Sequence, residues 1–173
     1  NGVEVIGGSA FMNDQKLESV MFPKSIRMIK SCVFSNCPKL RSVVLPEGFE
    51  KFRVQCFDEN LSLKHIDLPS TLTDLGEMTF ADCPNLETVV LRSPKKLDYR
   101  WCFDAILYDN KMVNPYLYVP ADLVEQYKQD PEWGVFKHIL PIDERFHIRK
   151  TTTEEHEELM RIMREIAENE IDD

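Results

Sequence analysis

One aromatic residue recurs at a constant interval along most of the chain. The phenylalanines spaced 23 residues apart are Phe11, Phe34, Phe57, Phe80 and Phe103. Two further columns keep the same spacing: Leu17, Leu40, Leu63 and Leu86, and Val20, Val43, Ile66 and Val89. A fixed period of this length is typical of a solenoid, in which each unit buries its apolar face against the next unit. The repeat therefore argues against a compact globule with one central core.

Each repeat unit predicts two extended segments. Complete units run over residues 3–25, 26–48, 49–71 and 72–94, and each ends in a stretch of the form Leu-x-x-Val/Ile-x-Leu. Its apolar residues alternate between inward and outward positions, which predicts a short strand, and in the first three units a proline then ends that strand. Apolar pairs three residues apart predict a second, shorter segment opposite: Val3 and Ile6, Ile26 and Ile29, Phe49 and Phe52, Leu72 and Leu75. We expect the Phe column to fill the space between the two sides.

The five cysteines form a poor disulfide framework. They are Cys32, Cys37, Cys56, Cys83 and Cys102. Cys37 and Cys83 share a column two units apart, as do Cys56 and Cys102, so their separation of about 10 Å exceeds the roughly 7 Å Cα limit for a bridge. This argument does not apply to Cys32 and Cys37, which belong to one unit. We expect five free, mostly buried thiols that behave as small hydrophobic side chains.

A turn column carries short polar or thiol side chains. Its members are Asp14, Cys37, Asn60 and Cys83. Such side chains hydrogen-bond the backbone of the turn in which they lie, which gives these cysteines a structural role. The alternative is a pair of reactive thiols, but no basic residue adjoins either one in the sequence to lower its pKa.

The repeat fails after Phe103. Residues 104–115 predict an irregular segment, Tyr116–Val119 a strand stopped by Pro120, and residues 121–129 a short helix. A compact apolar set comes next: Trp133, Phe136, Ile139, Leu140 and Ile142. We expect this part to cap the array, because the last unit of a stack exposes an apolar face.

The C-terminal residues predict an amphipathic helix. Thr152 and Glu155 fit a capping box. The apolar stripe after it, at helical spacing, is Leu159, Ile162, Met163, Ile166 and Ala167. Such a helix either lies against the array or docks onto a partner. The predicted organisation is thus a repeat array of about four and a half units over residues 1–103, an irregular repeat and cap over 104–142, and a linker with a tail helix over 143–173.

The bulk composition excludes some classes of function. Hydrophobic residues make up 43% and charged residues 29% of the 173 residues, as in ordinary folded proteins. A net charge of −9 argues against a nucleic-acid surface. No apolar run approaches the roughly 20 residues of a membrane-spanning helix, so no membrane insertion is expected from this segment. The chain begins at Asn1, almost at a unit boundary, and we interpret it as a processed or trimmed piece.

The repeat unit closely resembles the BspA-type leucine-rich repeat. The matching pattern is an Ile-x-x-Ile start, a Phe followed by x-x-Cys-x-x-Leu, and x-x-Ile-x-Leu-Pro, as in FSNCPKLRSVVLP and FADCPNLETVVL. Two units, FMNDQKLESVMFP and FDENLSLKHIDLP, keep the apolar skeleton without the cysteine. The fourth unit departs from the pattern at its end, where Arg92 replaces the usual proline. The segment LYVPADLVEQYKQDPEWGVFKHILPI also resembles a known element. It is similar to the C-terminal element that commonly closes such arrays in Bacteroidetes-like bacteria.

The resemblance implies a mostly β, α+β protein: a curved parallel leucine-rich-repeat solenoid with a C-terminal strand and helix cap. Members of this family are mostly surface or secreted proteins, so it also implies an extracellular or cell-surface location and a role in adhesion. The family has no catalytic residues to carry over. The sequence itself offers no phosphate loop, no Cys-x-x-Cys and no histidine cluster, so we expect no enzyme, no cofactor and no metal site.

The outward side of the predicted strands is the candidate recognition surface. Its candidate ligand-binding residues are Met21, Arg41, Ser42, Val44, Lys64, His65, Asp67, Thr88 and Val90. Small residues beside moderately apolar ones predict a flat, accessible strip for a protein or carbohydrate ligand, including one of host origin. The alternative is an ordinary solvated face, because single exposed apolar residues are common. A second hypothesis is a structural spacer, or a scaffold that self-associates through the uncapped N-terminal repeat.

Overall fold

A computed structural model describes residues 2–104, 115–143 and 146 of the chain. Contacts between Cα atoms divide the chain into two units, Asn1–Ile142 and Asp143–Asp173. Of the second unit only Asp143 and Phe146 are described, and the Phe146 N–H donates to the Asp143 carbonyl at 3.0 Å. The predicted helix over 151–171 lies outside the described residues.

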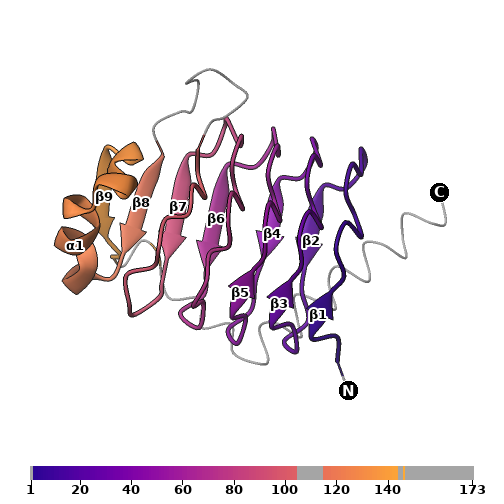
Figure 1. The fold of residues 1–173 in the computed structure, drawn as a ribbon, viewed down its shortest axis with the longest axis horizontal. Coiled ribbons are helices and arrows are strands. Elements are labelled where there is room, and N and C mark those ends of the chain that lie inside the picture. Colours follow the sequence, from indigo (N-terminus) through magenta and orange to yellow (C-terminus); the bar gives the residue numbers. More distant parts are fainter. Residues whose placement is uncertain (1, 105–114, 144–145, 147–173) are drawn as a thin grey trace. The chain divides into compact units, whose positions relative to one another are not determined.

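The first unit is a stack of coils in which every strand pair is parallel (Figure 1). The strands along one side of the stack are β2 (Ser19–Met21), β4 (Ser42–Val44), β6 (His65–Leu68), β7 (Thr88–Leu91), β8 (Tyr116–Val119) and β9 (His138–Pro141). They form a two-stranded sheet, β2-β4, and a four-stranded sheet, β6-β7-β8-β9. This is the parallel solenoid that the 23-residue spacing predicts.

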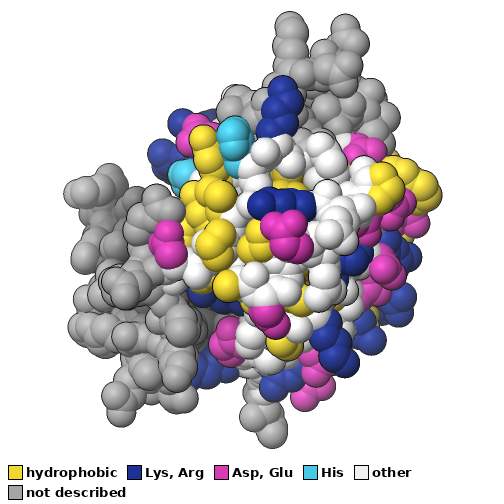
Figure 2. All heavy atoms as spheres, turned by 90° about the vertical axis from the view of Figure 1, so that its left-hand side faces the viewer, with side chains coloured by type: hydrophobic (Ala, Val, Ile, Leu, Met, Phe, Trp, Pro, Cys, Tyr) yellow, Lys and Arg dark blue, Asp and Glu magenta, His cyan; other side chains and the backbone are white. Residues whose placement is uncertain are grey.

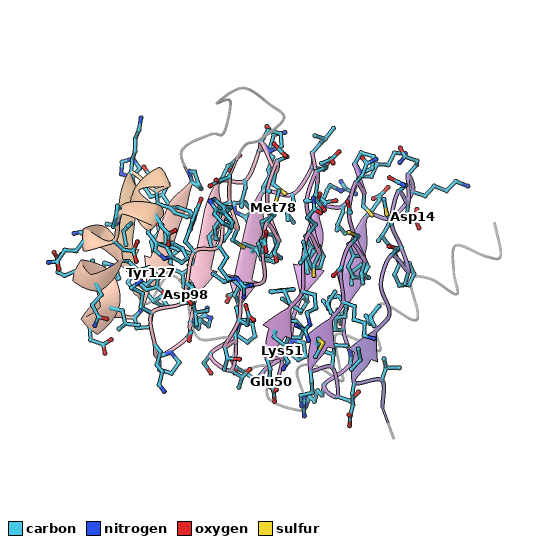
Figure 3. All side chains as sticks on the ribbon, in the orientation of Figure 1. Asp14, Glu50, Lys51, Met78, Asp98 and Tyr127 are labelled. Atoms are coloured by element: carbon cyan, nitrogen blue, oxygen red, sulfur yellow. The ribbon has the colours of Figure 1, made fainter. Side chains whose placement is uncertain are left out.

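The second, shorter extended segment is also present on the opposite side of the coils. It consists of β1 (Val5–Ile6), β3 (Met28–Ile29) and β5 (Lys51–Phe52). These strands pair in the order β1-β3-β5. An isolated bridge between Lys51 and Asp74 extends this row into the fourth repeat, residues 72–94. Figure 3 shows Glu50 and Lys51 at this edge of the coils, with Asp14 and Met78 at the other edge.

The Phe column runs through the core as predicted. Successive rings from Phe11 to Phe103 are nearly parallel, with centroid separations of 5.3, 4.9, 5.7 and 5.6 Å. This spacing is set by the parallel strands, which lie about 4.8 Å apart and bring equivalent side chains into register. The four rings from Phe34 to Phe103 are at most 1% exposed, so the column is the centre of the hydrophobic core.

The turn column has the structural role expected for it. The Cys37 thiol donates to the Phe11 carbonyl and the Cys83 thiol to the Phe57 carbonyl, both at 3.3 Å. The Asn60 amide donates to the equivalent carbonyl of the preceding unit, that of Phe34, at 3.0 Å. Thiol and amide thus satisfy the same kind of buried carbonyl, which explains why they alternate in this column. All five cysteines are free, and all but the half-buried Cys32 are buried.

Residues in two further columns adopt a left-handed backbone conformation that their residue types do not predict. Positive φ values of 53° to 58° recur at Ser9, Cys32, Gln55, Met78 and Trp101. A second series, with φ of 53° to 63°, contains Asn13, Asn36, Glu59 and Asp82. Asn and Asp are common in this conformation, whereas Gln, Met and Trp are rarely found in it. The turn geometry is therefore imposed by stacking on the neighbouring coils.

The C-terminal part continues the sheet. After β8 come the 3-10 helix η1 (Ala121–Leu123), the helix α1 (Val124–Gln129) and a second 3-10 helix, η2 (Pro131–Val135). The predicted strand and short helix are thus confirmed. The predicted compact apolar set also contains a strand that the sequence analysis did not predict: residues 138–141 form β9, which pairs with β8 in parallel. The sequence obscured this strand because it does not follow the repeat spacing.

Candidate ligand-binding face

Two rows of side chains point away from the core along the main strand side. We call them the outer sheet face. The first row is Ser19, Ser42, His65, Thr88, Tyr116 and His138, and the second is Met21, Val44, Asp67, Val90, Tyr118 and Leu140. The residues between the two rows, from Val20 to Ile139, point inward and pack in or against the core. Strand alternation therefore positions every residue of the face.

The side chains in the N-terminal part of the outer sheet face are short and polar or half-buried. Ser42 is exposed, and Met21 and Val44, which are register partners, are half-buried. Arg41 lies at the flank, where its guanidinium forms an ion pair with the Glu18 carboxylate. Both side chains of this pair are exposed, so the pair contributes little stability and remains available to a partner.

The middle of the face holds two more ion pairs. Arg92 donates to both carboxylate oxygens of Asp67, at 2.7 Å from Nε and 2.8 Å from Nη2. These hydrogen bonds raise the pKa of the Arg92 guanidinium. The Lys64 ammonium lies 3.5 Å from the Glu87 carboxylate. The arginine that replaces the usual proline of the repeat therefore ties β7 to β6 on the outer side.

Val90 corrects the prediction of a uniformly accessible strip. The residue points outward in register, opposite Asp67 on one side and Tyr118 on the other, yet it is only 3% exposed. Its register partner Tyr118 is itself only 8% exposed, so two adjacent outward positions are buried. The expectation that Val90 is exposed is wrong, because its repeat neighbours predicted small flanking residues, whereas β8 supplies a tyrosine instead.

The largest side chains of the face were missed by the sequence reasoning. Tyr116 and Leu140 are 41% and 36% exposed, and His138 is exposed as well. The Tyr116 and His138 rings stack with centroids 4.4 Å apart and planes 9° apart. Figure 2 shows hydrophobic side chains gathered beside the two described histidines. Alternation in Tyr116-Leu117-Tyr118-Val119 was the available signal, but the insertion before it concealed its register with β7.

The described thiols do not offer a nucleophile. Burial raises the pKa of Cys56 and Cys83 far above that of a free cysteine, and it raises the pKa of Cys102 to about 12. At neutral pH these groups are protonated thiols, which are poor nucleophiles and poor metal ligands. Among the described residues there is also no group of three or more His, Cys, Asp or Glu side chains that could hold a metal ion.

One buried carboxyl group lies behind the turns. Asp58 is 3% exposed, and its Oδ2 accepts a hydrogen bond from Gln55 Nε2 at 3.2 Å. Its Oδ1 accepts none from the described part of the chain. Burial raises the pKa of Asp58 to about 6, and the neighbouring Ser35 hydroxyl opposes this rise. The equivalent residues of the adjacent units are Ser35 and Ala81, so the repeat itself does not require a carboxylate here.

No described helix is long and apolar enough to cross a bilayer.

Comparison with solved structures supports the fold. The pneumococcal vaccine antigen PcpA superposes with a TM-score of 0.64 at 16% identity, over 81% of this chain and 39% of that one. A leucine-rich repeat protein from Bacteroides ovatus matches at 25% identity and a TM-score of 0.46, over 68% of this chain and 37% of that one. A leucine-rich repeat protein of T. pallidum matches at 22% identity and a TM-score of 0.44, over 68% and 62%. The chain thus spans less than two thirds of each of these proteins.

Sequence comparison identifies the family. No curated protein matches this chain. The family model for the BspA type leucine-rich repeat region matches residues 1–106 in six copies, which is more than half of the 173 residues. The match covers the coils that carry the Phe column and the turn cysteines. The chain therefore belongs to the BspA-type leucine-rich repeat family.

Proposed function

We propose that this chain is a non-catalytic binding module of a bacterial surface or secreted protein, and that it takes a protein or glycan ligand on the outer sheet face. The observation that carries the proposal is the pair of in-register rows, which present side chains from six parallel strands on one side of the stack. Repeat stacks use such extended faces for recognition. The extracellular location follows from the nature of the family and is part of the proposal.

A pair of valine substitutions tests whether the outer face binds. Val44 lies on the outer face, whereas Val54 is 38% exposed in a turn away from the outer rows. We expect Val44→Asp to weaken binding to a captured matrix protein or glycan by about tenfold, since it introduces an unpaired charge into the contact. Val54→Asp is the matched control and keeps the affinity. Equal melting temperatures exclude unfolding as the cause, and equal binding by both variants contradicts the proposal.

A second candidate function is self-association or spacing through the N-terminal coil. The observation that favours it is the exposure of four apolar side chains on this coil, namely Val3, Val5, Phe11 and Met12, which are 44% to 56% exposed. Exposed apolar groups of this kind mark contact surfaces. Light scattering at rising concentration tests the idea: Phe11→Lys reduces the apparent mass if copies associate through this coil. A strict monomer at high concentration contradicts it.

A further inference from the structure

A small side chain lies between two rings on the outer sheet face. Thr88 is half-buried and pairs in register with His65 on β6 and with Tyr116 on β8. Neighbouring strands lie about 4.8 Å apart, so the backbones that carry the two rings are separated by roughly 10 Å across Thr88. The threonine side chain is much shorter than either ring. We call this position, with its two flanking rings, the Thr88 site.

The Tyr116 ring is oriented toward this site. One of its faces is stacked on His138 at 4.4 Å, on the strand beyond. On the side away from His138 the neighbouring strand is β7, where Thr88 is the register partner of Tyr116. The Tyr118 ring, two residues along β8, lies nearly parallel to the Tyr116 ring with centroids 6.4 Å apart. Tyr116 as a whole is 41% exposed, so part of its side chain is available for contact. A flat group stacked on one ring lies roughly 3.5–4 Å from its plane, which the strand spacing on the Thr88 side accommodates.

Two ion pairs border the Thr88 site along the strand direction. Lys64 and Glu87 immediately precede the His65–Thr88 register pair, and Asp67 and Arg92 lie near the next outward pair, Asp67–Val90. Both ion pairs join a residue of the β6 coil to one of the β7 coil. They offer carboxylate acceptors and N–H donors on either side of the threonine hydroxyl. The site thus combines one aromatic wall with several planar hydrogen-bonding groups.

The charges of the outer sheet face are neutralised within the face. Besides the two pairs that border the site, Arg41 pairs with Glu18. The chain as a whole carries a net charge of −9, so this balance is a local property. A ligand recognised mainly through its charge would find no unmatched partner among these groups. The observations therefore favour an uncharged, hydroxyl-rich ligand over an anionic or cationic one.

Two features disfavour a peptide or a large protein surface as the main occupant. Pro141 occupies the last position of the edge strand β9 and has no N–H for pairing with an added strand. The apolar residues Val90 and Tyr118 are already covered, at 3% and 8% exposure. A standard protein interface buries about 800 Å² on each partner around an apolar centre, whereas here Tyr116 and Leu140 alone are exposed large apolar residues of the four-stranded sheet.

We propose that the Thr88 site binds a pyranose unit of a neutral glycan, stacked on Tyr116 and hydrogen-bonded by Thr88 and the bordering ion pairs. The inference rests on the proposed function of the outer sheet face and names the ligand class of its C-terminal part. Recognition combines ring contact with hydrogen bonds to sugar hydroxyls. It does not depend on ionic attraction.

The test uses the full chain on an array that carries neutral, sialylated and sulfated oligosaccharides and a set of matrix proteins. Thr88→Tyr fills the position between the rings, and Ser19→Tyr makes a comparable change at the equivalent outward position of β2. We expect binding to neutral oligosaccharides to fall about tenfold in Thr88→Tyr and to stay within about twofold in Ser19→Tyr. Tyr116→Ala, which removes an exposed ring, is a second variant with the same expected loss. Because the bordering charges are paired, raising NaCl from about 0.05 to about 0.5 M should change binding less than about twofold.

The outcomes separate this inference from the proposed function. Binding confined to sialylated or sulfated glycans overturns the neutral-ligand inference, as does neutral-glycan binding that both Thr88→Tyr and Tyr116→Ala retain. If the chain binds only a matrix protein and loses it in Val44→Asp, the glycan inference is wrong and the proposed function stands. If Val44→Asp, Thr88→Tyr and Tyr116→Ala all leave every interaction of the chain intact, the proposed function fails as well.

Discussion

The two ends of the Phe column differ sharply in how they are closed. At the N-terminal end Phe11 stacks, among the described residues, only on Phe34, and it is 44% exposed. At the other end Phe103 is fully buried, because Trp133 and Phe136 lie against it with ring centroids 6.1 and 5.2 Å away. The same residue type in the same column is thus exposed at one end and buried at the other, and the difference is made by the aromatic residues that pack against the C-terminal ring.

The closed end also satisfies backbone polar groups that a bare coil would leave unpaired. The Leu97 N–H donates to the Tyr127 hydroxyl at 3.1 Å, and the Leu97 carbonyl accepts from Trp133 Nε1 at 3.2 Å. Figure 3 shows Tyr127 beside Asp98, the residue after Leu97. Two aromatic residues with polar groups therefore close the core and its last loop together. A plain aliphatic cover could supply only the apolar contact.

This difference predicts that stability is concentrated at the C-terminal end. Truncating a fully buried aromatic residue removes its transfer free energy and leaves a cavity, whereas truncating a half-exposed one does not. We expect Trp133→Ala to lower the free energy of unfolding by about 3–5 kcal/mol and Phe11→Ala by about 1 kcal/mol or less. Urea denaturation followed by circular dichroism measures both. Similar losses for the two variants would show that the N-terminal coil is as well covered as the C-terminal one.

In the coils between the two ends, the described buried side-chain atom without a hydrogen-bond partner is Oδ1 of Asp58. The pKa of Asp58 is about 6 in the folded protein, whereas an unfolded aspartate has a pKa of about 3.9. The folded state therefore holds the proton more tightly, so the contribution of this group is most favourable at low pH and is lost as the pH rises through about 6. Asp58→Ser, which copies Ser35 of the preceding unit, should stabilise the chain by about 1–2 kcal/mol at pH 8 and by much less near pH 4.

Glu77→Gln is the control for this effect, because it removes a half-buried carboxylate of the next coil that does not shift the pKa of Asp58. Its effect on the free energy of unfolding should stay within about 0.5 kcal/mol at both pH values. A stabilisation by Asp58→Ser that is equal at pH 4 and pH 8 would mean that ionisation of the carboxyl group is not the cause.

The difference between the repeating coils and the non-repeating C-terminal segment also separates what the sequence could predict from what it could not. Strand positions, the Phe column and the turn cysteines all follow from the 23-residue spacing, because each is a property of a single unit placed next to a copy of itself. Strand β9 and the aromatic part of the outer sheet face depend on how a non-repeating segment registers with β7, and spacing carries no information about that. The burial of Val90 has the same origin, since Tyr118 comes from β8. The left-handed backbone conformation at Gln55 and Met78 could not be predicted, because stacking and not residue type selects it.

The closed end also carries an electrostatic contact. Lys96 forms an ion pair with Asp130, and the Asp130 carboxylate accepts from the Glu132 N–H at the start of η2. The hydrogen bond from Lys96 lowers the pKa of Asp130. The stabilisation is therefore present above the pKa of an unfolded aspartate, about 3.9, and is lost as the pH falls through the lower folded value.

Asp130→Asn keeps an acceptor for the Glu132 N–H and removes the charge. Because both partners retain some contact with water, we expect a loss of about 1 kcal/mol or less at pH 7. The difference from the wild type should shrink as the pH falls below the pKa of an unfolded aspartate and the wild-type carboxyl group also becomes neutral. Chemical denaturation at neutral and at acidic pH measures this, and Glu125→Gln, at the exposed pair with Lys128 on α1, is the matched control with a smaller effect. A pH-independent loss in Asp130→Asn would assign the contribution to the geometry of the turn. The C-terminal end would then owe its advantage over the N-terminal end to packing and neutral hydrogen bonds alone.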